Sequence, residues 1–200
     1  MATATPSIAC LGVIGRNNNP LHITIFPSFD AATNTRAPLR TPLQFSLLLS
    51  STLDVFEARS RRSASAAPAS TPAGSSSAPL VSGDFGLLHA VDERLAAYGF
   101  ETNTGVKFVA VVDMRGSTSN TIAGRGAGVG LRDTELRIVF RAMQTAYVRL
   151  LQNPFYDPDE HAPLMPAGGG GAGGKRITSR KFAEEMRRIG EAWAPGVTNL

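Results

Sequence analysis

The sequence is poor in cysteine and lysine, and it has no long hydrophobic run. Its only cysteine, Cys10, excludes an internal disulfide, which fits a reducing compartment. No stretch approaches the roughly 18–20 apolar residues that cross a bilayer. The N-terminus also lacks the basic region of a secretory signal, because Arg16 is the only basic residue before Asp30. These absences favour a cytoplasmic protein.

Clustered positive charge is also scarce, although the sequence pI is about 9.7 and the formal net charge is +4. Nucleic-acid binding favours a basic face with aromatic side chains for base stacking, whereas these arginines are spread along the chain. A solvated basic surface is the simpler interpretation. One basic group stands out in the expected last helix: Arg180, Lys181, Arg187 and Arg188. This group keeps a nucleic-acid-binding module open as an alternative.

Three segments have too few large apolar residues to pack: residues 59–82, 115–129 and 162–176. Small and polar residues dominate them, and such a composition does not bury enough surface to offset the entropy lost on ordering. The rest of the chain has an ordinary size for one domain. We therefore expect a single domain over residues 7–194, with the three loose insertions inside it.

The N-terminal half predicts a hairpin followed by a helix. Residues 8–15 form a β-branched apolar run, and residues 21–26 alternate apolar and polar side chains, as a half-buried strand does. An asparagine-rich turn that ends in Pro20 joins them. Residues 43–59 place an apolar stripe on one side of a helix. The members of this stripe are Phe45, Leu48, Leu49, Leu53 and Phe56.

The C-terminal half predicts three strands and then two helices. The strands lie at residues 85–90, 94–101 and 106–113, and the last is apolar nearly throughout, as a central strand covered on both faces is. The helices at residues 133–152 and 178–193 each carry one apolar stripe. The connections between strands are too short for parallel crossovers, so we expect antiparallel pairing. The order is ββαβββαα, an α+β fold with one five-stranded sheet and helices on its faces.

Catalytic constellations are missing from the sequence. His22, His89 and His161 lie on a strand, a strand and a loop, without the spacing of a metal motif. No GxSxG nucleophile motif occurs. Residues 169–175 match the first seven positions of GxxxxGK(S/T), but Arg176 stands where the hydroxyl would be. We therefore predict no catalytic residues, no cofactor, no metal site and no enzyme activity.

Several short strings together resemble one protein family. They are residues 8–15 (IACLGVIG), 51–55 (STLDV), 98–103 (YGFETN), 106–109 (VKFV), 131–133 (LRD) and 153–156 (NPFY). In this order they resemble the trafficking protein particle complex (TRAPP) subunit 2-like proteins, relatives of sedlin. The resemblance covers most of the expected folded part and departs from the family at the three loose segments.

This resemblance implies a fold and a function. The fold is the longin-like or sedlin fold, a five-stranded antiparallel sheet with one helix on one face and two on the other. The implied function is that of a non-catalytic subunit of a vesicle-tethering complex, which supports complex assembly and Rab GTPase activation in ER-Golgi and Golgi trafficking. The implied partners are other TRAPP subunits, with a Rab GTPase reached only through the complex. Membrane association at the Golgi and ER-Golgi membranes is peripheral and likewise occurs through the complex.

Two groups of residues are candidates for the protein interface. The first helix carries more apolar side chains than one face buries, and an exposed carboxylate among them would select a basic partner. This candidate comprises Asp54, Val55 and Phe56, within an apolar surplus of Leu47, Leu48, Leu49, Val55 and Phe56. The second candidate ends a helix and offers an aromatic anchor, and it comprises Asn153, Pro154, Phe155 and Tyr156.

Other interpretations stay open. Asp54 would have no binding role if it only faced solvent, and Phe155 and Tyr156 would be structural if they only packed against the fold. A longin-domain trafficking adaptor outside TRAPP fits the same fold. A basic nucleic-acid-binding module is the third interpretation, although the strand at residues 106–113 carries only Phe108 as an aromatic residue.

Overall fold

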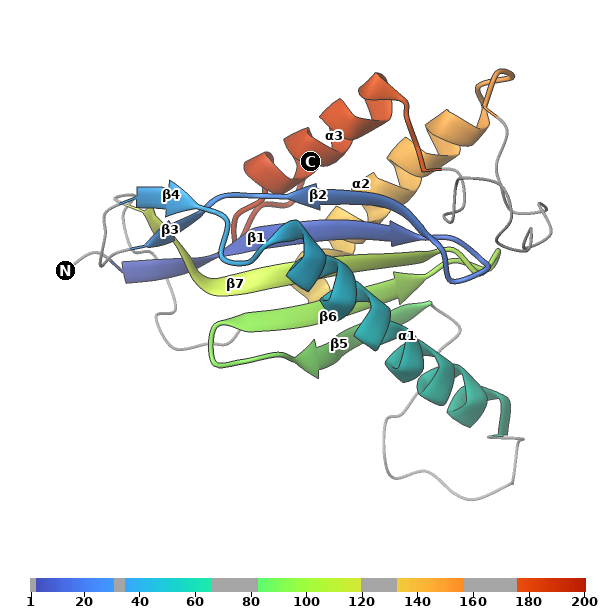
Figure 1. The fold of residues 1–200 in the computed structure, drawn as a ribbon, viewed down its shortest axis with the longest axis horizontal. Helices are drawn as coiled ribbons and strands as arrows, with labels where there is room; N and C mark the ends of the chain where they lie inside the picture. The colour runs from blue at the N-terminus through green and yellow to red at the C-terminus, as the bar shows by residue number, and fades with distance from the viewer. Residues whose placement is uncertain (1–2, 31–34, 66–82, 120–132, 157–175) are drawn as a thin grey trace.

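The computed structural model describes residues 3–30, 35–65, 83–119, 133–156 and 176–200. Its centre is a five-stranded antiparallel sheet with the strands in the order β2-β1-β7-β6-β5 (Figure 1). The strands of this sheet are β1 (Thr3–Ile14), β2 (Pro20–Ile25), β5 (Asp84–Ala90), β6 (Leu95–Glu101) and β7 (Lys107–Ser119).

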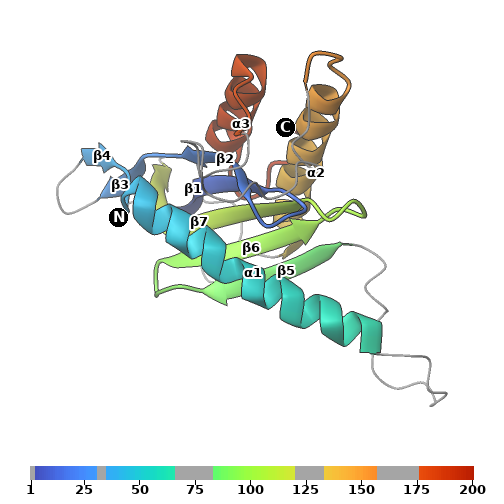
Figure 2. The ribbon, with the colours of Figure 1, turned by 45° about the vertical axis from the view of Figure 1, so that its right-hand side comes forward.

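Helices cover both faces of the sheet, as Figures 1 and 2 show. Helix α1 (Pro42–Ser65) runs diagonally across one face, and α2 (Asp133–Leu151) and α3 (Arg180–Ala192) lie side by side on the other. This is the α+β architecture with an antiparallel sheet that the sequence predicts. Within the described residues, none of the helices combines the length and the apolar character that a bilayer crossing requires.

The order of elements differs from the predicted ββαβββαα by two short strands. β3 (Ser28–Asp30) and β4 (Thr35–Ala37) pair with each other between β2 and α1 and form a separate two-stranded sheet. The sequence did not predict them, because three residues are too few to show the alternation that marks a strand. β1 also begins before the predicted domain start at residue 7, through pairing of its polar first residues with the end of β7.

Two of the predicted loose segments begin inside regular structure. Helix α1 continues to Ser65, so the first part of residues 59–82 is helical. Strand β7 continues to Ser119, so the first part of residues 115–129 is paired with β1. The predicted boundaries at residues 59 and 115 are therefore wrong. Of the third segment, residues 162–176, only Arg176 belongs to the described residues.

The central strand β7 separates two core layers. Its residues from Phe108 to Val112 are fully buried, which confirms the prediction of a strand covered on both faces. Val109 and Val111 face the α1 layer, whereas Phe108, Ala110 and Val112 face α2 and α3. The sheet thus holds α1 and the α2–α3 pair on opposite faces, each against its own core layer.

Tight turns fix two of the hairpins of the sheet, β1–β2 and β6–β7. Asn18 adopts a left-handed conformation with φ of 60° in the turn between β1 and β2, as its short polar side chain permits. Gly105, with φ of 84°, closes the turn between β6 and β7, and its N–H donates to the carbonyl of Thr102 at 2.9 Å. These turns set the register that places each core residue on its side of the sheet.

Candidate functional site

Helix α1 has one buried side, which packs on the sheet. Phe45, Leu48, Leu49 and Phe56 are buried at the spacing predicted from the sequence, whereas Leu53 is only partly buried. Thr52 lies on the buried side, and its hydroxyl donates to the carbonyl of Leu49 at 2.6 Å. This side serves the core and leaves the opposite side of α1 available for binding.

The opposite side of α1 exposes two large leucines. Leu43 is 70% exposed and Leu47 is 62% exposed. Ser50 and Asp54 follow at helical spacing on the same side, and both are exposed. We call Leu43, Leu47, Ser50 and Asp54 the α1 outer face. It is apolar near the start of the helix and acidic near its middle.

The carboxylate on the α1 outer face is unpaired. Among the residues that the structure describes, Asp54 has no hydrogen bond and no ion pair. The next acidic residue, Glu57, pairs with Arg61 one turn further along the helix. Asp54 is therefore the acidic group of this face that a basic partner could pair with, beside the apolar surface of the leucines.

The structure rearranges the first predicted group of interface residues. Asp54 is exposed as the hypothesis requires, and Val55 is partly buried. Phe56 is fully buried and makes an edge-to-face contact with Phe85, with ring centroids 5.1 Å apart, so it belongs to the core and cannot meet a partner. Leu48 and Leu49 are buried as well, so the apolar surplus on the surface is Leu43 with Leu47.

Contacts near both ends of α1 fix it on the sheet. Just before the helix, the Arg40 guanidinium donates to the Asp92 carboxylate at 2.7 Å. Partial burial acts to raise the pKa of Asp92. The hydrogen bond and charge of Arg40, together with the N–H groups of Leu95 and Arg94, outweigh this effect and lower the pKa.

Further along α1, Arg59 donates to two carbonyl groups of the edge strand β5, those of Phe85 and Leu87. The carbonyls of an edge strand are free to bond groups outside the sheet, and here a guanidinium of α1 takes them. The α1 outer face is therefore held in a fixed position by contacts on both sides of it.

The second predicted group of interface residues lies where α2 ends. The Phe155 N–H donates to the Asn153 side-chain oxygen at 3.2 Å, and the Tyr156 N–H donates to the Asn153 carbonyl at 3.0 Å. This turn leaves Phe155 95% exposed, whereas Tyr156 packs partly against the core. Val148 and Leu151, which are 44% and 41% exposed, lie in the last turn of α2, shortly before Phe155 in the chain. We call Val148, Leu151 and Phe155 the α2 end patch.

The two predicted groups do not form one site. The α1 outer face and the α2 end patch belong to helices on opposite faces of the sheet (Figures 1 and 2). The fold therefore offers two separate contact surfaces, as a subunit placed between neighbours would need.

A buried charged cluster went unpredicted. The Asp113 carboxylate is fully buried; it accepts from the Arg94 guanidinium at 2.8 and 3.0 Å, from the Arg115 N–H at 2.9 Å and from the Ser28 hydroxyl. Arg94 also donates to the carbonyl of Phe29 at 3.0 Å. The cluster joins β3 to β6 and β7. Ser28 is itself buried, so its hydroxyl is not open to a substrate.

The described histidines and acids do not assemble a catalytic or metal centre. His22 lies 2.8 Å from the Thr24 hydroxyl and packs edge-on against Phe182, and desolvation by burial lowers its pKa. His89 is exposed on β5. In the described ranges, no three side chains among the histidines, acids and Cys10 are close enough to hold a metal ion. His161 and the glycine-rich string at residues 169–175 lie outside those ranges.

Comparison with known proteins identifies a family that the chain matches. The family model described as Sedlin matches residues 13–192. A mouse protein named trafficking protein particle complex subunit 2-like protein is 29% identical over 173 residues, which cover 86% of this chain and 89% of the mouse protein. A Dictyostelium discoideum protein of the same name is 26% identical over 182 residues, which cover 91% of this chain and 95% of that protein. The similarity thus extends over nearly the whole length of both relatives.

Proposed function

Because this chain belongs to the sedlin family, we propose that it is a non-catalytic subunit of a TRAPP vesicle-tethering complex. Its fold is then the longin-like fold of that family. Its direct partners are other TRAPP subunits, and it supports Rab GTPase activation only as part of the assembled complex. It resides in the cytoplasm and reaches Golgi and ER-Golgi membranes through the complex, in ER-Golgi and Golgi trafficking.

The observation that carries this proposal is the α1 outer face. Leu43 and Leu47 place apolar side chains in solvent on a helix whose other side is fully used by the core. Moving a leucine side chain out of water contributes about 1.5–3 kcal/mol, so leaving two exposed is a cost that a partner removes. About two turns beyond Leu47, Asp54 adds a carboxylate with no ion pair among the described residues, which favours a partner with a basic group beside an apolar groove.

The α2 end patch is the second contact surface in this proposal. Phe155 presents almost its whole ring to solvent, and buried aromatic anchors often dominate the energy of an interface. Of the seven residues predicted from the sequence, Asp54, Asn153, Pro154 and Phe155 are exposed, and Val55 and Tyr156 form the partly buried edges of the two surfaces. Each surface takes a different neighbour in the complex.

Nucleic acid has no role in this proposal. Two of the four basic residues of α3 already have acidic partners, because Arg188 pairs with Glu185 at 2.8 Å and Arg187 lies 3.8 Å from Glu191. Positive charge that is neutralised within its own helix attracts phosphates weakly. A longin-domain adaptor outside TRAPP remains the competing function, and it differs in the partners that the chain recovers.

The experiment is affinity purification of the tagged chain from native cytosol, followed by quantitative mass spectrometry. Wild type should recover TRAPP subunits, and Leu47→Asp should lose at least one of them by about tenfold, the effect of roughly 1.4 kcal/mol. The matched control is Leu87→Asp, which puts the same change on a leucine of β5 that is 42% exposed and lies outside the α1 outer face.

The control should recover the same partners as wild type. Recovery of other trafficking proteins without TRAPP subunits would contradict the TRAPP proposal and support the competing function, an adaptor outside TRAPP. Equal losses in Leu47→Asp and Leu87→Asp would show that the α1 outer face is not a specific interface. Thermal unfolding of both variants confirms beforehand that they are folded.

A further inference from the structure

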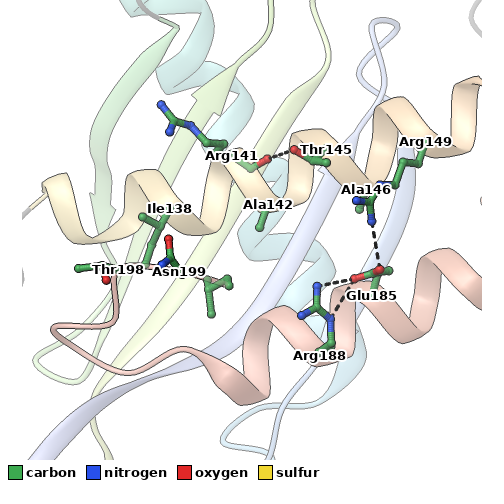
Figure 3. Close-up of a pocket in the computed structure, with 11 residues that line it drawn as sticks. Ile138, Arg141, Ala142, Thr145, Ala146, Arg149, Glu185, Arg188, Thr198 and Asn199 are labelled. Atoms are coloured by element: carbon green, nitrogen blue, oxygen red, sulfur yellow. Dashed lines mark hydrogen bonds and ion pairs between the residues drawn. The ribbon is translucent and has the colours of Figure 1, made fainter.

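A groove between α2 and α3 gathers arginine side chains around a small cavity (Figure 3). The cavity has a volume of about 220 Å³, and its wall includes Arg141 and Arg149 from α2 and Arg188 from α3. Glu185 is the acidic side chain in this wall. We call this cavity with its four charged residues the α2–α3 groove. It lies across the sheet from the α1 outer face.

The charges of the groove do not balance. Glu185 accepts from Arg188 at 2.8 and 3.1 Å, but its contact with Arg149 is longer, at 3.5 Å. One carboxylate thus faces two guanidinium groups, and the Arg149 contact is outside the usual range for a strong charged hydrogen bond. Arg149 can therefore turn to a ligand without breaking a close ion pair.

Arg141 adds a further positive charge beside the groove. Its guanidinium points away from Glu185 and from α3 (Figure 3), and among the described residues its side chain has no ion pair and no hydrogen bond, so it can turn toward a ligand in the groove. A main-chain carboxylate at Leu200, the last residue of the printed chain, would add one negative charge to the wall. The lining still keeps an excess of positive charge, so the complementary ligand is an anion.

The size of the cavity and its apolar lining narrow the class of ligand. Pockets for whole small molecules usually measure roughly 300–1,000 Å³, so the smaller groove suits one or two side chains. Ala142 and Ala146 line it between Arg141 and Arg149, Ile138 lines it about one turn before Arg141, and these three apolar residues are partly or fully buried. A peptide side chain can enter between the two helices, whereas a bilayer surface cannot reach apolar atoms that are recessed in this way.

We propose that the α2–α3 groove binds an acidic peptide segment of a partner protein. Carboxylates of the peptide pair with Arg141 and Arg149, and an apolar side chain between them contacts Ala142 and Ala146. Arg141 and Arg149 are eight positions apart, which is about 12 Å along a helix. An extended peptide advances about 3.3 Å per residue, so the two acids are three or four residues apart. This site is independent of the α1 outer face.

The probe is a fluorescein-labelled peptide, Glu-Leu-Ser-Glu-Glu-Leu-Ser-Glu, measured by fluorescence anisotropy with the full chain at low salt. Its matched control replaces every glutamate by glutamine. The acidic peptide should bind and the amide peptide should not. Reversing the two α2 charges with Arg141→Glu and Arg149→Glu together should weaken binding by about tenfold or more, because two charge-assisted contacts are replaced by repulsion.

The matched protein variant is Arg187→Glu, which reverses a charge on α3 outside the groove. It should change the affinity by less than about threefold, the size of a surface electrostatic effect. Equal weakening by Arg187→Glu, or equal binding of the acidic and amide peptides, would overturn the proposal. So would an absence of binding by wild type that circular dichroism shows to be folded.

Two further ligands distinguish a peptide from other anions. Inorganic phosphate should displace the peptide only at high concentration, and vesicles of phosphatidylcholine with phosphatidylserine should not compete for the groove. Binding of those vesicles that the Arg141→Glu, Arg149→Glu variant abolishes would replace the peptide by a membrane surface and refute the proposal. Failure of this proposal leaves the TRAPP assignment untouched, because that assignment is tested by the partners recovered through α1.

Discussion

Gly190 should be a position where adding a single methyl group destabilises the fold. It lies in α3, buried against the ring of Phe26, and a Cβ built there would come closer than 3.0 Å to three atoms of that ring. Real Cβ atoms essentially never make such contacts, so Phe26 or the helix has to shift. The close approach of α3 to the sheet therefore depends on the missing side chain.

Two effects of opposite sign determine how much Gly190→Ala changes the free energy of unfolding. Alanine is favoured over glycine inside a helix by about 0.8–1 kcal/mol. Overpacking a core position costs about 1–3 kcal/mol. The ring of Phe26 is itself 4% exposed and enclosed by the core, so it cannot turn into solvent to relieve the contact. We therefore expect the overpacking cost to lie in the upper part of its range, about 2–3 kcal/mol, which leaves a net loss of about 1–2 kcal/mol.

Urea unfolding of wild type and Gly190→Ala, followed by circular dichroism, measures this loss. In a thermal experiment the same loss lowers the melting temperature by about 2–4 °C per kcal/mol for a chain of this size. Gly190→Ala in a Phe26→Leu background should cost less, with a coupling of about 1 kcal/mol between the two sites. A stabilised Gly190→Ala protein would refute the reasoning, because it would show that α3 does not press on Phe26.

The other predictions concern two buried groups and one partly buried group. Asp113→Ala should reduce the free energy of unfolding by about 3 kcal/mol or more, because Arg94 loses its buried partner; a loss below about 1 kcal/mol in urea would contradict this. Burial raises the pKa of Cys10 to about 12, so a thiol reagent should label it only after unfolding, and rapid labelling of the native protein would refute its burial. Burial lowers the pKa of His22 from its ordinary 6.5, so the unfolded chain binds more protons and stability should fall as the pH drops through and below 6.5. His22→Gln should flatten this dependence in urea titrations at pH 7 and 5, and an unchanged slope would exclude His22 as its source.

The sequence predicted the elements with strong periodic patterns. The central strand is apolar at every position from Phe108 to Val112, and the last helix spaces Phe182, Met186, Ile189 and Trp193 along one side; all of these residues are buried. Such patterns indicate which residues are buried, because side chains at regular spacings lie on the same face of a helix or strand. Leu151 is the exception at the end of α2: it is 41% exposed, whereas the neighbouring Leu150 is buried in the core.

Predicting the interface on α1 required knowing which of its side chains face solvent. The number of apolar residues in the helix does not determine this. The surplus on α1 was real, but it consists of Leu43 and Leu47, while Leu48, Leu49 and Phe56 are buried. The spacing of Leu43, Leu47 and Asp54, opposite to the buried stripe, contained the signal that would have identified the outer face. The apolar residues that lie outside the buried stripe identify the exposed face, whereas the total number of apolar residues in the helix does not.

The buried charged cluster carried no comparable signal. Asp113 lies on β7 and Arg94 lies in the bend just before β6, 19 residues away in the sequence, and Ser28 comes from a short strand that the sequence did not reveal. Nothing in their local sequence distinguishes them from charged residues at a surface, because their partners are brought close only by the sheet register. A buried ion pair of this kind is determined by the tertiary structure and cannot be predicted from the local sequence pattern.

The central claim is that this chain works as a subunit of a TRAPP complex. Native size-exclusion chromatography of cytosol that contains the chain at its endogenous level, with mass spectrometry across the fractions, tests it most directly. The account predicts that the chain elutes far above its own 21.1 kDa, in the same fractions and at a constant ratio to other TRAPP subunits. Elution as a free protein, or in a large complex that contains no TRAPP subunit, would contradict it.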